Sequence, residues 1–396
     1  MNTVYLRGRS GGGPIHSIYR ELIKYPPEEY QFVTDSFRLM KQQQLQLDVF
    51  RAIEKISFTR KLWHELKTLQ YIGIRKLQNL KTSQKLKADL VYASQQLLFA
   101  DFPWIVDFEY ANALINYGDI KLAKRFVKKA LSSRYCMRIL PWSDWAKRTL
   151  FRSLDCDSFE EKIETLHFAV SPKNVITKKD KDKVRLLFVG SINLFNLYNF
   201  EWKGGFEVIE SFLKLNKKYE NLELIIRSWI PPEIREKCAN KQNIKILSSI
   251  LPENELAQLY ASSDIFLFPS YLNLGMAILE AMSYELPVVA VNLYDIPEAV
   301  QNMKTGILLN PPLNAPFYLW NDAPNHYARE LLQKIRQARP WMVNQIVEKT
   351  SLLIENNSLR ESIGRNARRL VEEGEFCIKR RNEKLKKIFD EAIAID

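Results

Sequence analysis

The second half of the chain alternates apolar, strand-like runs with helix-like segments, and this alternation constrains the fold more than any other feature. The strand-like runs between residues 184 and 291 are VRLLFVG, LELIIRS, IKILSS, DIFLFPS and PVVAV. Strands that alternate with helices are typical of βαβ units, which form a parallel sheet covered by helices. The sequence therefore predicts an α/β domain, and ligands of such sheets bind at the carboxyl ends of the strands.

The first half shows a looser version of this pattern. A strand-like run, TVYLRG, precedes a glycine run that includes Gly12 and Gly13, and the helix-like segment IHSIYRELIKY follows. Glycine allows the backbone to approach a ligand closely at a helix start, so Gly12 and Gly13 are candidate ligand-binding residues. The loop matches neither the dinucleotide-binding fingerprint nor the P-loop pattern.

A polar, charge-dense linker, SPKNVITKKDKDK, separates the two halves. The linker lies between two apolar segments and marks a domain boundary. We predict a Rossmann-like first domain over residues 1–175 and a Rossmann-like second domain over residues 184–375. A C-terminal helix is expected over residues 376–396, and this helix could cross back to the first domain.

The charge is distributed unevenly between the halves. Residues 1–180 contain 30 Lys and Arg against 19 Asp and Glu, whereas the remainder contains 28 against 27. A basic first half favours contact with an anionic surface, such as phospholipid or nucleic acid. No nucleic-acid recognition motif accompanies the charge, so we expect no nucleic-acid partner.

One helix-like segment, DIKLAKRFVKKALSSR, concentrates this charge. Its apolar residues recur at helical spacing and are expected to pack on the domain's own sheet. Its basic residues would then form an outward face that could dock on an anionic membrane or simply be solvated. These residues are Lys121, Lys124, Arg125, Lys128 and Lys129.

The composition also bears on the compartment. The four cysteines are scattered without CxxC spacing, which favours a reducing environment. The start MNTVYLRGRS is not typical of a signal peptide, and no apolar run is long enough to span a bilayer. We therefore expect a cytoplasmic protein that could lie peripherally on the inner face of a membrane.

The segments FVGS, WKGGFEVIESF and LPENELAQLYASSDIFLFPSYLNLGMAILEAMSYELPVVAV occur in an order that carries a resemblance. Residues 184–312 resemble the donor domain of GT-B-fold retaining glycosyltransferases, the group 1 family that includes phosphatidylinositol mannosyltransferase and sucrose synthase. The resemblance implies two Rossmann-like domains that face each other across a cleft. It also implies transfer of a sugar, with retention, from a UDP- or GDP-linked donor to a glycan or lipid-linked acceptor. The nucleotide sugar would be a substrate, and neither a cofactor nor a metal is expected.

The resemblance assigns roles to two charged residues. Lys203, in WKGG, matches the family's phosphate-binding lysine, which would stabilise the departing diphosphate as its charge grows. Glu280 matches the second glutamate of the family's E-x7-E motif and would accept hydrogen bonds from the ribose hydroxyls. Gly275 and Met276, at the expected helix start, would offer free backbone amides to an anion. The alternatives are a solvated lysine and a surface glutamate.

The sequence departs from the family pattern at two positions. Ser191 stands where the family has an arginine, and Leu272 stands where the first glutamate of the motif is expected. Asn273 could replace that glutamate as a neutral hydrogen-bonding group, or it could be a turn residue. Arg227 could supply the missing cation, although we expect it to be an exposed residue at a strand end. Ser191 and Ile250 are retained as candidate donor-binding residues.

Two acids of the first half are candidate catalytic residues. Asp107 and Glu109, in WIVDFE, lie at the end of an expected strand. Either could contact the sugar or the acceptor, or it could cap the strand end. The departures at Ser191 and Leu272 also leave an alternative function open, in which a catalytically degenerate protein binds a nucleotide or acts as a partner subunit.

Overall fold

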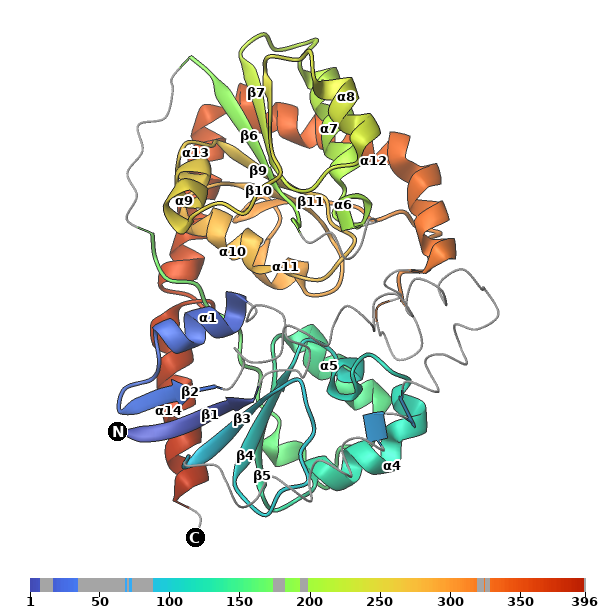
Figure 1. Ribbon diagram of the computed structural model, residues 1–396. Coiled ribbons are helices and arrows are strands. Elements are labelled where there is room, and N and C mark those ends of the chain that lie inside the picture. Colours follow the sequence, from blue (N-terminus) through green and yellow to red (C-terminus); the bar gives the residue numbers. More distant parts are fainter. Residues whose placement is uncertain are drawn as a thin grey trace. The chain divides into compact units, whose positions relative to one another are not determined.

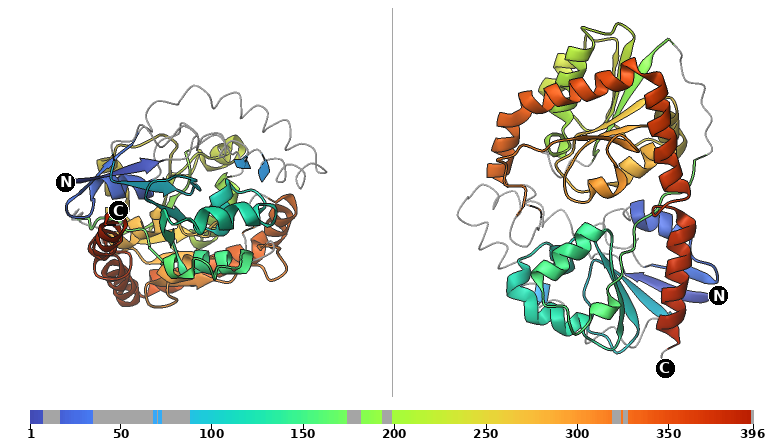
Figure 2. Two further views of the ribbon diagram at one scale, coloured as in Figure 1. Left: turned by 90° about the horizontal axis from the view of Figure 1, so that it is seen from below. Right: turned by 180° about the vertical axis from the view of Figure 1, so that it is seen from behind.

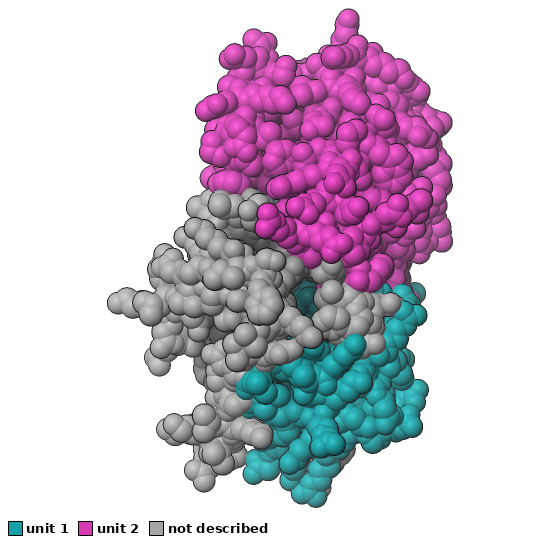
Figure 3. All heavy atoms as spheres, turned by 90° about the vertical axis from the view of Figure 1, so that its right-hand side faces the viewer, with its two compact units in different colours: residues 1–169, 320–323, 378–396 teal, residues 170–319, 324–377 magenta. Residues whose placement is uncertain are grey.

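The computed structural model describes residues 1–7, 17–34, 68–69, 71–72, 88–173, 182–192, 199–318, 324 and 328–394. The chain forms two compact units, which Figure 1 shows as ribbons and Figure 3 distinguishes by colour. The first unit contains Met1–Ala169 and Ile378–Asp396, and the second contains Val170–Leu319 and Pro324–Cys377.

The first unit is built on a five-stranded parallel sheet with the order β2-β1-β3-β4-β5. Its strands are β1 (Asn2–Arg7), β2 (Tyr30–Val33), β3 (Leu90–Ser94), β4 (Trp104–Phe108) and β5 (Cys136–Pro141). Its helices are α1 (Ser17–Lys24), η1 (Ala111–Ile115), α4 (Ile120–Leu131), α5 (Asp144–Ser153), η2 (Glu160–Lys162) and α14 (Ile378–Ile393). Every residue of β3 and β4 is buried, because the parallel strands are covered on both faces.

Local capping explains where two of these helices begin. The Asp119 side chain accepts a hydrogen bond from the backbone N–H of Lys121 at 2.9 Å and caps α4. The Ser143 hydroxyl accepts one from the backbone N–H of Ala146 at 3.0 Å and caps α5, a position that serine favours. The apolar stripe of α4 is buried in the unit's core, so its basic residues are left on the outer side.

The last helix, α14, belongs to the first unit. It contacts β3 and β5, and Figure 2 shows it running along the sheet of this unit. The ring of Phe389 lies 5.0 Å from the ring of Tyr30, and the Tyr30 hydroxyl donates to Asp390 at 2.6 Å. The Arg381 guanidinium donates to the carbonyl of Tyr25 at 2.6 Å. The end of the chain therefore completes the packing of the unit that contains its beginning.

The second unit contains a six-stranded parallel sheet with the order β11-β10-β9-β6-β7-β8. Its strands are β6 (Val184–Val189), β7 (Leu222–Arg227), β8 (Ile244–Leu247), β9 (Ile265–Phe268), β10 (Val288–Val291) and β11 (Gly306–Leu309). In chain order this is the doubly wound 3-2-1-4-5-6 arrangement, whose strand order reverses between β6 and β9. The expected α/β fold class is confirmed.

Helices flank this sheet on both faces. They are α6 (Asn199–Trp202), α7 (Gly205–Leu215), α8 (Pro232–Cys238), α9 (Glu253–Ala261), α10 (Met276–Ser283), α11 (Ile296–Ala299), α12 (Arg329–Glu355) and α13 (Asn357–Glu372). The long α12 packs on α7, and α13 packs on α10. The boundaries of α9 and α10 agree closely with the segments ENELAQLYASS and GMAILEAMSY, and Glu280 lies in the second turn of α10.

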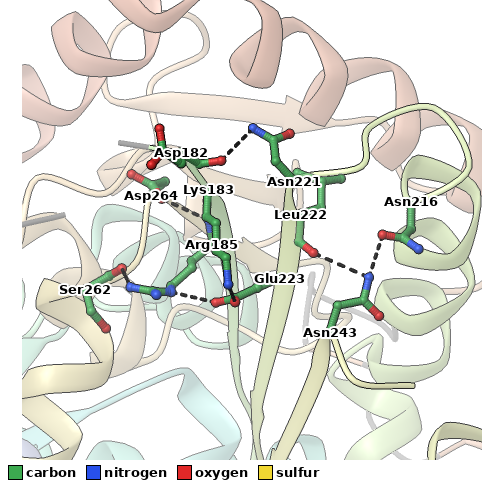
Figure 4. Close-up of polar contacts among 10 residues, drawn as sticks. All are labelled: Asp182, Lys183, Arg185, Asn216, Asn221, Leu222, Glu223, Asn243, Ser262 and Asp264. Carbon is green, nitrogen blue, oxygen red and sulfur yellow. Dashed lines mark hydrogen bonds and ion pairs between the residues drawn. The ribbon is translucent and has the colours of Figure 1, made fainter. Parts of the chain in front are cut away.

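The amino-terminal edge of the second sheet is held by paired charges and amides (Figure 4). Glu223 of β7 accepts hydrogen bonds from Lys183 at 2.6 Å and from Arg185 at 2.7 Å. The carboxylate of Asp264 accepts the backbone N–H of Arg185 at 2.8 Å. Lys183 and Arg185 therefore each have a carboxylate partner, and these contacts fix β6 against β7 and β9.

Candidate functional site

The carboxyl-terminal edge of the second sheet brings a tight turn against β9. Gly204 has a φ of +74°, and a Cβ built on it would lie 2.3 Å from the carbonyl oxygen of Pro269. The backbone N–H of Tyr271 donates to the carbonyl of Trp202 at 2.9 Å. Only glycine fits such a positive φ with so close a contact. The turn therefore places Lys203 at the point where the strand order reverses, which is where doubly wound sheets bind ligands.

A buried ionic network anchors the same turn. Glu201 is 4% exposed and accepts two hydrogen bonds from Arg336 of α12, both at 2.8 Å. Arg339 donates to Glu201 at 2.7 Å and lies over the ring of Phe206 at 4.6 Å. Because the carboxylate is buried and shared by two guanidinium groups, the turn is tied to α12. The backbone of Lys203 is consequently held in a fixed position.

The Lys203 ammonium group has no hydrogen bond or ion pair to the residues that the structure describes. Burial lowers its pKa from 10.5 to about 8, and the nearby Arg227 guanidinium adds to this shift. Both causes act against the charged form. A cation that lacks a counterion in the protein is poised to bind an anionic ligand.

Arg227, the last residue of β7, lies within the electrostatic reach of Lys203. It is only partly exposed, and its Nε atom is buried without a hydrogen-bond partner among the described residues. Burial lowers its pKa, while the charges of Tyr260 and Glu280 oppose that shift. The expectation of an exposed strand-end residue is therefore wrong. The sequence contained a signal for this outcome, because Arg227 lies at the carboxyl end of a strand, where parallel sheets bind their ligands.

Glu280 belongs to the same group of residues, because its charge acts on Arg227. Its carboxylate accepts a hydrogen bond from the Tyr260 hydroxyl of α9 at 2.9 Å. Burial and the adjacent Glu280 charge raise the pKa of Tyr260 well above 10, so this phenol stays a donor. Tyr260 was not identified in the sequence, because nothing in the pattern of α9 distinguishes it from a core tyrosine. Glu280 is partly exposed and retains capacity to accept further hydrogen bonds.

The start of α10 is open to a ligand. Gly275 caps this helix without a side-chain hydrogen bond, and a Cβ built on it would meet only Phe268, at 3.9 Å. At the other glycines in the described ranges, a Cβ would come within 2.5 Å of a neighbouring atom. Space beside Gly275 therefore lets a group approach the first-turn backbone N–H groups, which favour an anion. The Met276 side chain is 5% exposed and packs inward, so this residue can offer only its backbone.

The other candidate donor-binding residues stay predictions. The carbonyl of Ser191 accepts hydrogen bonds from Trp229 at 2.9 Å and from Ser228 at 3.1 Å. Ile250 is 82% exposed, between β8 and α9. Leu272 and Asn273 are partly buried in the loop between β9 and α10. Gly12 and Gly13 lie outside the described residues.

Asp107 and Glu109 of the first unit have local partners. Asp107 is 1% exposed and accepts hydrogen bonds from Tyr19 at 2.9 Å, Tyr92 at 3.1 Å and the backbone N–H of Gln95 at 3.1 Å. Burial raises its pKa from 3.8 to about 6, although these donors oppose the shift. The geometry favours the strand-end alternative for Asp107, which joins β3, β4 and α1. Glu109 accepts a hydrogen bond from the Tyr117 hydroxyl.

A cavity of about 580 Å³ lies on the sheet of the second unit between β7, β8 and α9. Arg185, Glu223, Ile225 and Lys245 contribute to its lining, together with Gln258 of α9. It does not include Lys203, Arg227 or Glu280. Its Arg185 and Glu223 already neutralise each other, so the unpaired cations at the carboxyl edge define the stronger candidate site.

The chain is similar to known proteins in both sequence and structure. Residues 183–318 match the model of the family described as glycosyl transferases group 1. The sulfoquinovosyl transferase SQD2 of Arabidopsis thaliana is 46% identical over 70 residues, which are 17% of this chain and 14% of that protein. An uncharacterized glycosyltransferase of Methanocaldococcus jannaschii is 26% identical over 239 residues, 59% of this chain and 50% of that one. An uncharacterized glycosyltransferase of Haemophilus influenzae is 25% identical and covers 65% of this chain and 73% of its own.

The chain thus spans half or less of the first two relatives that it matches. Two solved structures cover nearly all of both chains. The Anabaena Alr3699/HepE structure in complex with UDP and glucose has a TM-score of 0.59 at 13% identity and covers 98% of this chain and 99% of that chain. A glycosyltransferase from Rickettsia africae has a TM-score of 0.56 at 17% identity and covers 100% and 99%.

Likeness at this identity concerns the fold, whereas the family match concerns the segment that carries Lys203 and Glu280. The chain therefore has the GT-B fold, and its residues 183–318 are similar to the group 1 glycosyltransferases.

Proposed function

We propose that the protein transfers a sugar, with retention of anomeric configuration, from a UDP- or GDP-linked donor to a glycan or lipid-linked acceptor. The observation that carries the proposal is Lys203, an unpaired cation held at the switch point of the second sheet. The open start of α10 lies on the same edge of the sheet and offers a second position at which a negatively charged group could bind.

In this proposal the diphosphate binds Lys203 and the first-turn backbone N–H groups of α10. Glu280 accepts hydrogen bonds from the ribose hydroxyls, because an ionised carboxylate offers two acceptor oxygens to a vicinal diol. As the bond between the sugar and the diphosphate breaks, the electron pair moves to the phosphate oxygen. Lys203 stabilises the charge that grows there.

The relatives support the donor class. The Anabaena structure is described in complex with UDP and glucose, and a pneumococcal O-GlcNAc transferase with a TM-score of 0.55 is described in complex with UDP and GlcNAc. Both point to a uracil nucleotide as the first donor to try. We propose that no metal is required, because protein cations supply the positive charge that a metal would bring.

The test is incubation of pure protein with a panel of UDP- and GDP-linked sugars. Slow hydrolysis of one donor would report an active site without knowledge of the acceptor. Proton NMR of the first sugar product would then give its anomeric configuration, and an inverted product would contradict retention. Activity should survive EDTA, whereas loss of activity on chelation and recovery with a divalent cation would overturn the metal-free proposal.

A second candidate function is a nucleotide-binding partner subunit without transferase activity. Leu272 favours it, because an apolar side chain stands where the family places an acid near the transferred sugar. Substitution Leu272→Glu separates the two candidates. A gain of donor hydrolysis would indicate a decayed enzyme, while a loss would indicate a pocket built around leucine for a different sugar.

The outer face of α4 supports a proposal about the acceptor. Lys124, Arg125 and Lys129 are exposed and have no ion pair to described residues, whereas Lys128 is bonded to Asp155 at 2.6 Å. Each basic residue near an anionic leaflet contributes roughly 1 kcal/mol of attraction. We propose that this face docks reversibly on an anionic membrane, which would suit a lipid-linked acceptor. None of the helices in the described ranges has the length and apolar composition of a membrane span.

Vesicle co-sedimentation tests the docking. Binding should require anionic lipid, weaken with salt, and fall when Lys124, Arg125, Lys128 and Lys129 are replaced by Gln. Full recovery in the supernatant under all conditions would contradict docking and favour a soluble acceptor.

A further inference from the structure

Two neighbouring cations lie at the carboxyl edge of the second sheet, where a cation would normally be paired with a carboxylate. Lys203 and Arg227 come from different elements, and each lacks a hydrogen bond or ion pair from its charged group to the described residues. Burial lowers the pKa of Lys203, and the like charge of Arg227 lowers it further. Two unpaired cations that are held close together repel each other, and a bound anion would neutralise this repulsion.

The backbone fixes where Arg227 can act. Arg227 pairs in register with Val189 at the end of β6, and its carbonyl accepts the backbone N–H of Gly190 at 2.9 Å. Side chains alternate along a strand, so Arg227 shares a face of β7 with Glu223 and Ile225. This is the face on which α9 packs, as the common lining of the cavity between β7 and α9 shows. The guanidinium therefore emerges on the α9 side at the ligand-binding edge.

The buried Nε atom is the second observation. A donor buried without a partner costs free energy, and native proteins rarely leave one unsatisfied. The charge of Glu280 attracts Arg227, but that carboxylate forms its hydrogen bond with Tyr260, at 2.9 Å. Arg227 therefore interacts electrostatically with Lys203 and Glu280. The proposed function assigns the diphosphate to Lys203 and the ribose to Glu280.

We infer that Arg227 binds the diphosphate of the nucleotide together with Lys203, as the second cation of the site. This inference rests on the proposed function and adds a residue to it. The planar guanidinium can donate two parallel hydrogen bonds to phosphate oxygens, which an ammonium cannot. One phosphate group would satisfy the buried Nε and neutralise the repulsion between Lys203 and Arg227.

A competing role for Arg227 would be to orient Glu280 alone. That role concerns the ribose, so it would affect nucleosides and nucleoside diphosphates equally. Contact with phosphate would affect only the phosphorylated ligands. The comparison of ligands that differ by phosphate groups therefore distinguishes the two roles.

Calorimetry on the full chain provides this comparison, with uridine, UMP and UDP and with guanosine, GMP and GDP. For the base series that the wild-type protein binds, Arg227→Gln should weaken the diphosphate by about ten- to hundredfold. Its nucleoside affinity should stay within about twofold of wild type. Lys245→Gln, on the neighbouring strand β8, removes an exposed charge that has no described ion pair and should change neither affinity.

A second readout follows from the repulsion between the cations. Loss of the Arg227 charge should raise the pKa of Lys203 above about 8, so diphosphate binding should persist to higher pH in Arg227→Gln than in the wild type. If Arg227→Gln does not fold, Arg227→Lys keeps the charge but loses the fork, and it should weaken UDP or GDP severalfold while leaving the nucleoside unchanged.

The outcomes separate this inference from the function on which it rests. A wild-type protein that binds neither diphosphate would overturn both. Wild-type binding together with unchanged diphosphate affinity in the Arg227 variants would overturn the role of Arg227 alone. Equal losses for nucleoside and diphosphate would also overturn it, and would assign Arg227 to Glu280.

Discussion

The two ends of β7 treat charge in opposite ways. Glu223 near its amino end is bonded to Lys183 and Arg185, at 2.6 and 2.7 Å (Figure 4). Arg227 at its carboxyl end shares the same face of the strand, yet neither it nor Lys203 has an ion-pair partner among the described residues. One sheet thus contains a set of neutralised charges and a set that is left unneutralised.

The difference separates structure from function within one domain. The paired charges at the amino edge hold β6, β7 and β9 together. Their contribution can be measured as a change in the free energy of unfolding. Unpaired, partly desolvated cations at the carboxyl edge oppose folding, so their retention is explained by a ligand that neutralises them. Substitutions at one edge should therefore change stability, while substitutions at the other should change binding and catalysis.

The largest expected effect is at Lys203. Replacement by Ala should lower kcat by at least roughly a hundredfold, because the ammonium group acts mainly on the charge that develops on the leaving diphosphate. Thermal unfolding and steady-state kinetics on the same preparation would measure both properties. Lys183→Ala at the paired edge is the matched control and should retain activity. A Lys203→Ala enzyme with a near wild-type rate would show that Lys203 does not stabilise the leaving diphosphate.

Two glycines at the carboxyl edge should separate stability from binding. Gly204→Ala should lower the free energy of unfolding by about 1–3 kcal/mol or more, since it combines a left-handed φ with a contact of 2.3 Å to Pro269. Gly275→Ala has room for its Cβ, at 3.9 Å from Phe268, so it should leave stability nearly unchanged while weakening nucleotide binding. Chemical denaturation and calorimetry would measure the pair. Strong destabilisation by Gly275→Ala would remove the case for an open ligand seat.

Glu280→Gln should weaken nucleotide binding by about 1–3 kcal/mol, because a neutral amide accepts hydrogen bonds from the ribose less strongly than a carboxylate. The corresponding 2′-deoxynucleotide should lose less affinity on this substitution than the ribonucleotide does. Titration calorimetry with both ligands gives the comparison. Equal affinities for wild type and Glu280→Gln would mean that the carboxylate serves Tyr260 alone.

The pH dependence of nucleotide binding should follow Lys203. The free protein loses the Lys203 proton near pH 8, whereas a bound diphosphate favours the protonated form and raises its pKa. The dissociation constant should therefore be flat below about pH 8 and rise by up to roughly tenfold per pH unit above it. Binding measured from pH 6.5 to 9.5 checks this. Lys203→Gln should lose this alkaline rise, and a rise that persisted there would have another source.

The smallest effect is expected at the paired edge. Glu223→Gln should lower the free energy of unfolding by about 1 kcal/mol or less, because its ion pairs are partly exposed. Nucleotide affinity should be the same as in the wild type. Denaturant unfolding and calorimetry would measure the two quantities, and a clear loss of nucleotide affinity would break the proposed separation between the edges.

Local patterns predicted much of this domain. The apolar runs identified the strands, and the segment GMAILEAMSY located the start of α10, because capping and periodicity depend on neighbouring residues. Glu201 could not be recognised in this way, since its partners Arg336 and Arg339 lie 135 and 138 residues away. Tyr260 and the buried Nε of Arg227 also depend on tertiary packing, which a single sequence does not display.

The return of α14 to the first unit has a consequence for the order of folding. The hydrogen bond from Tyr30 to Asp390 joins residues 360 positions apart, and Phe32 and Tyr30 both pack against Phe389. On a ribosome the chain emerges from its amino terminus, and domains usually fold as they emerge. Here α14 cannot cover the aromatic side chains of β2 until the whole second unit has been synthesised. The unit that is made first is therefore completed last.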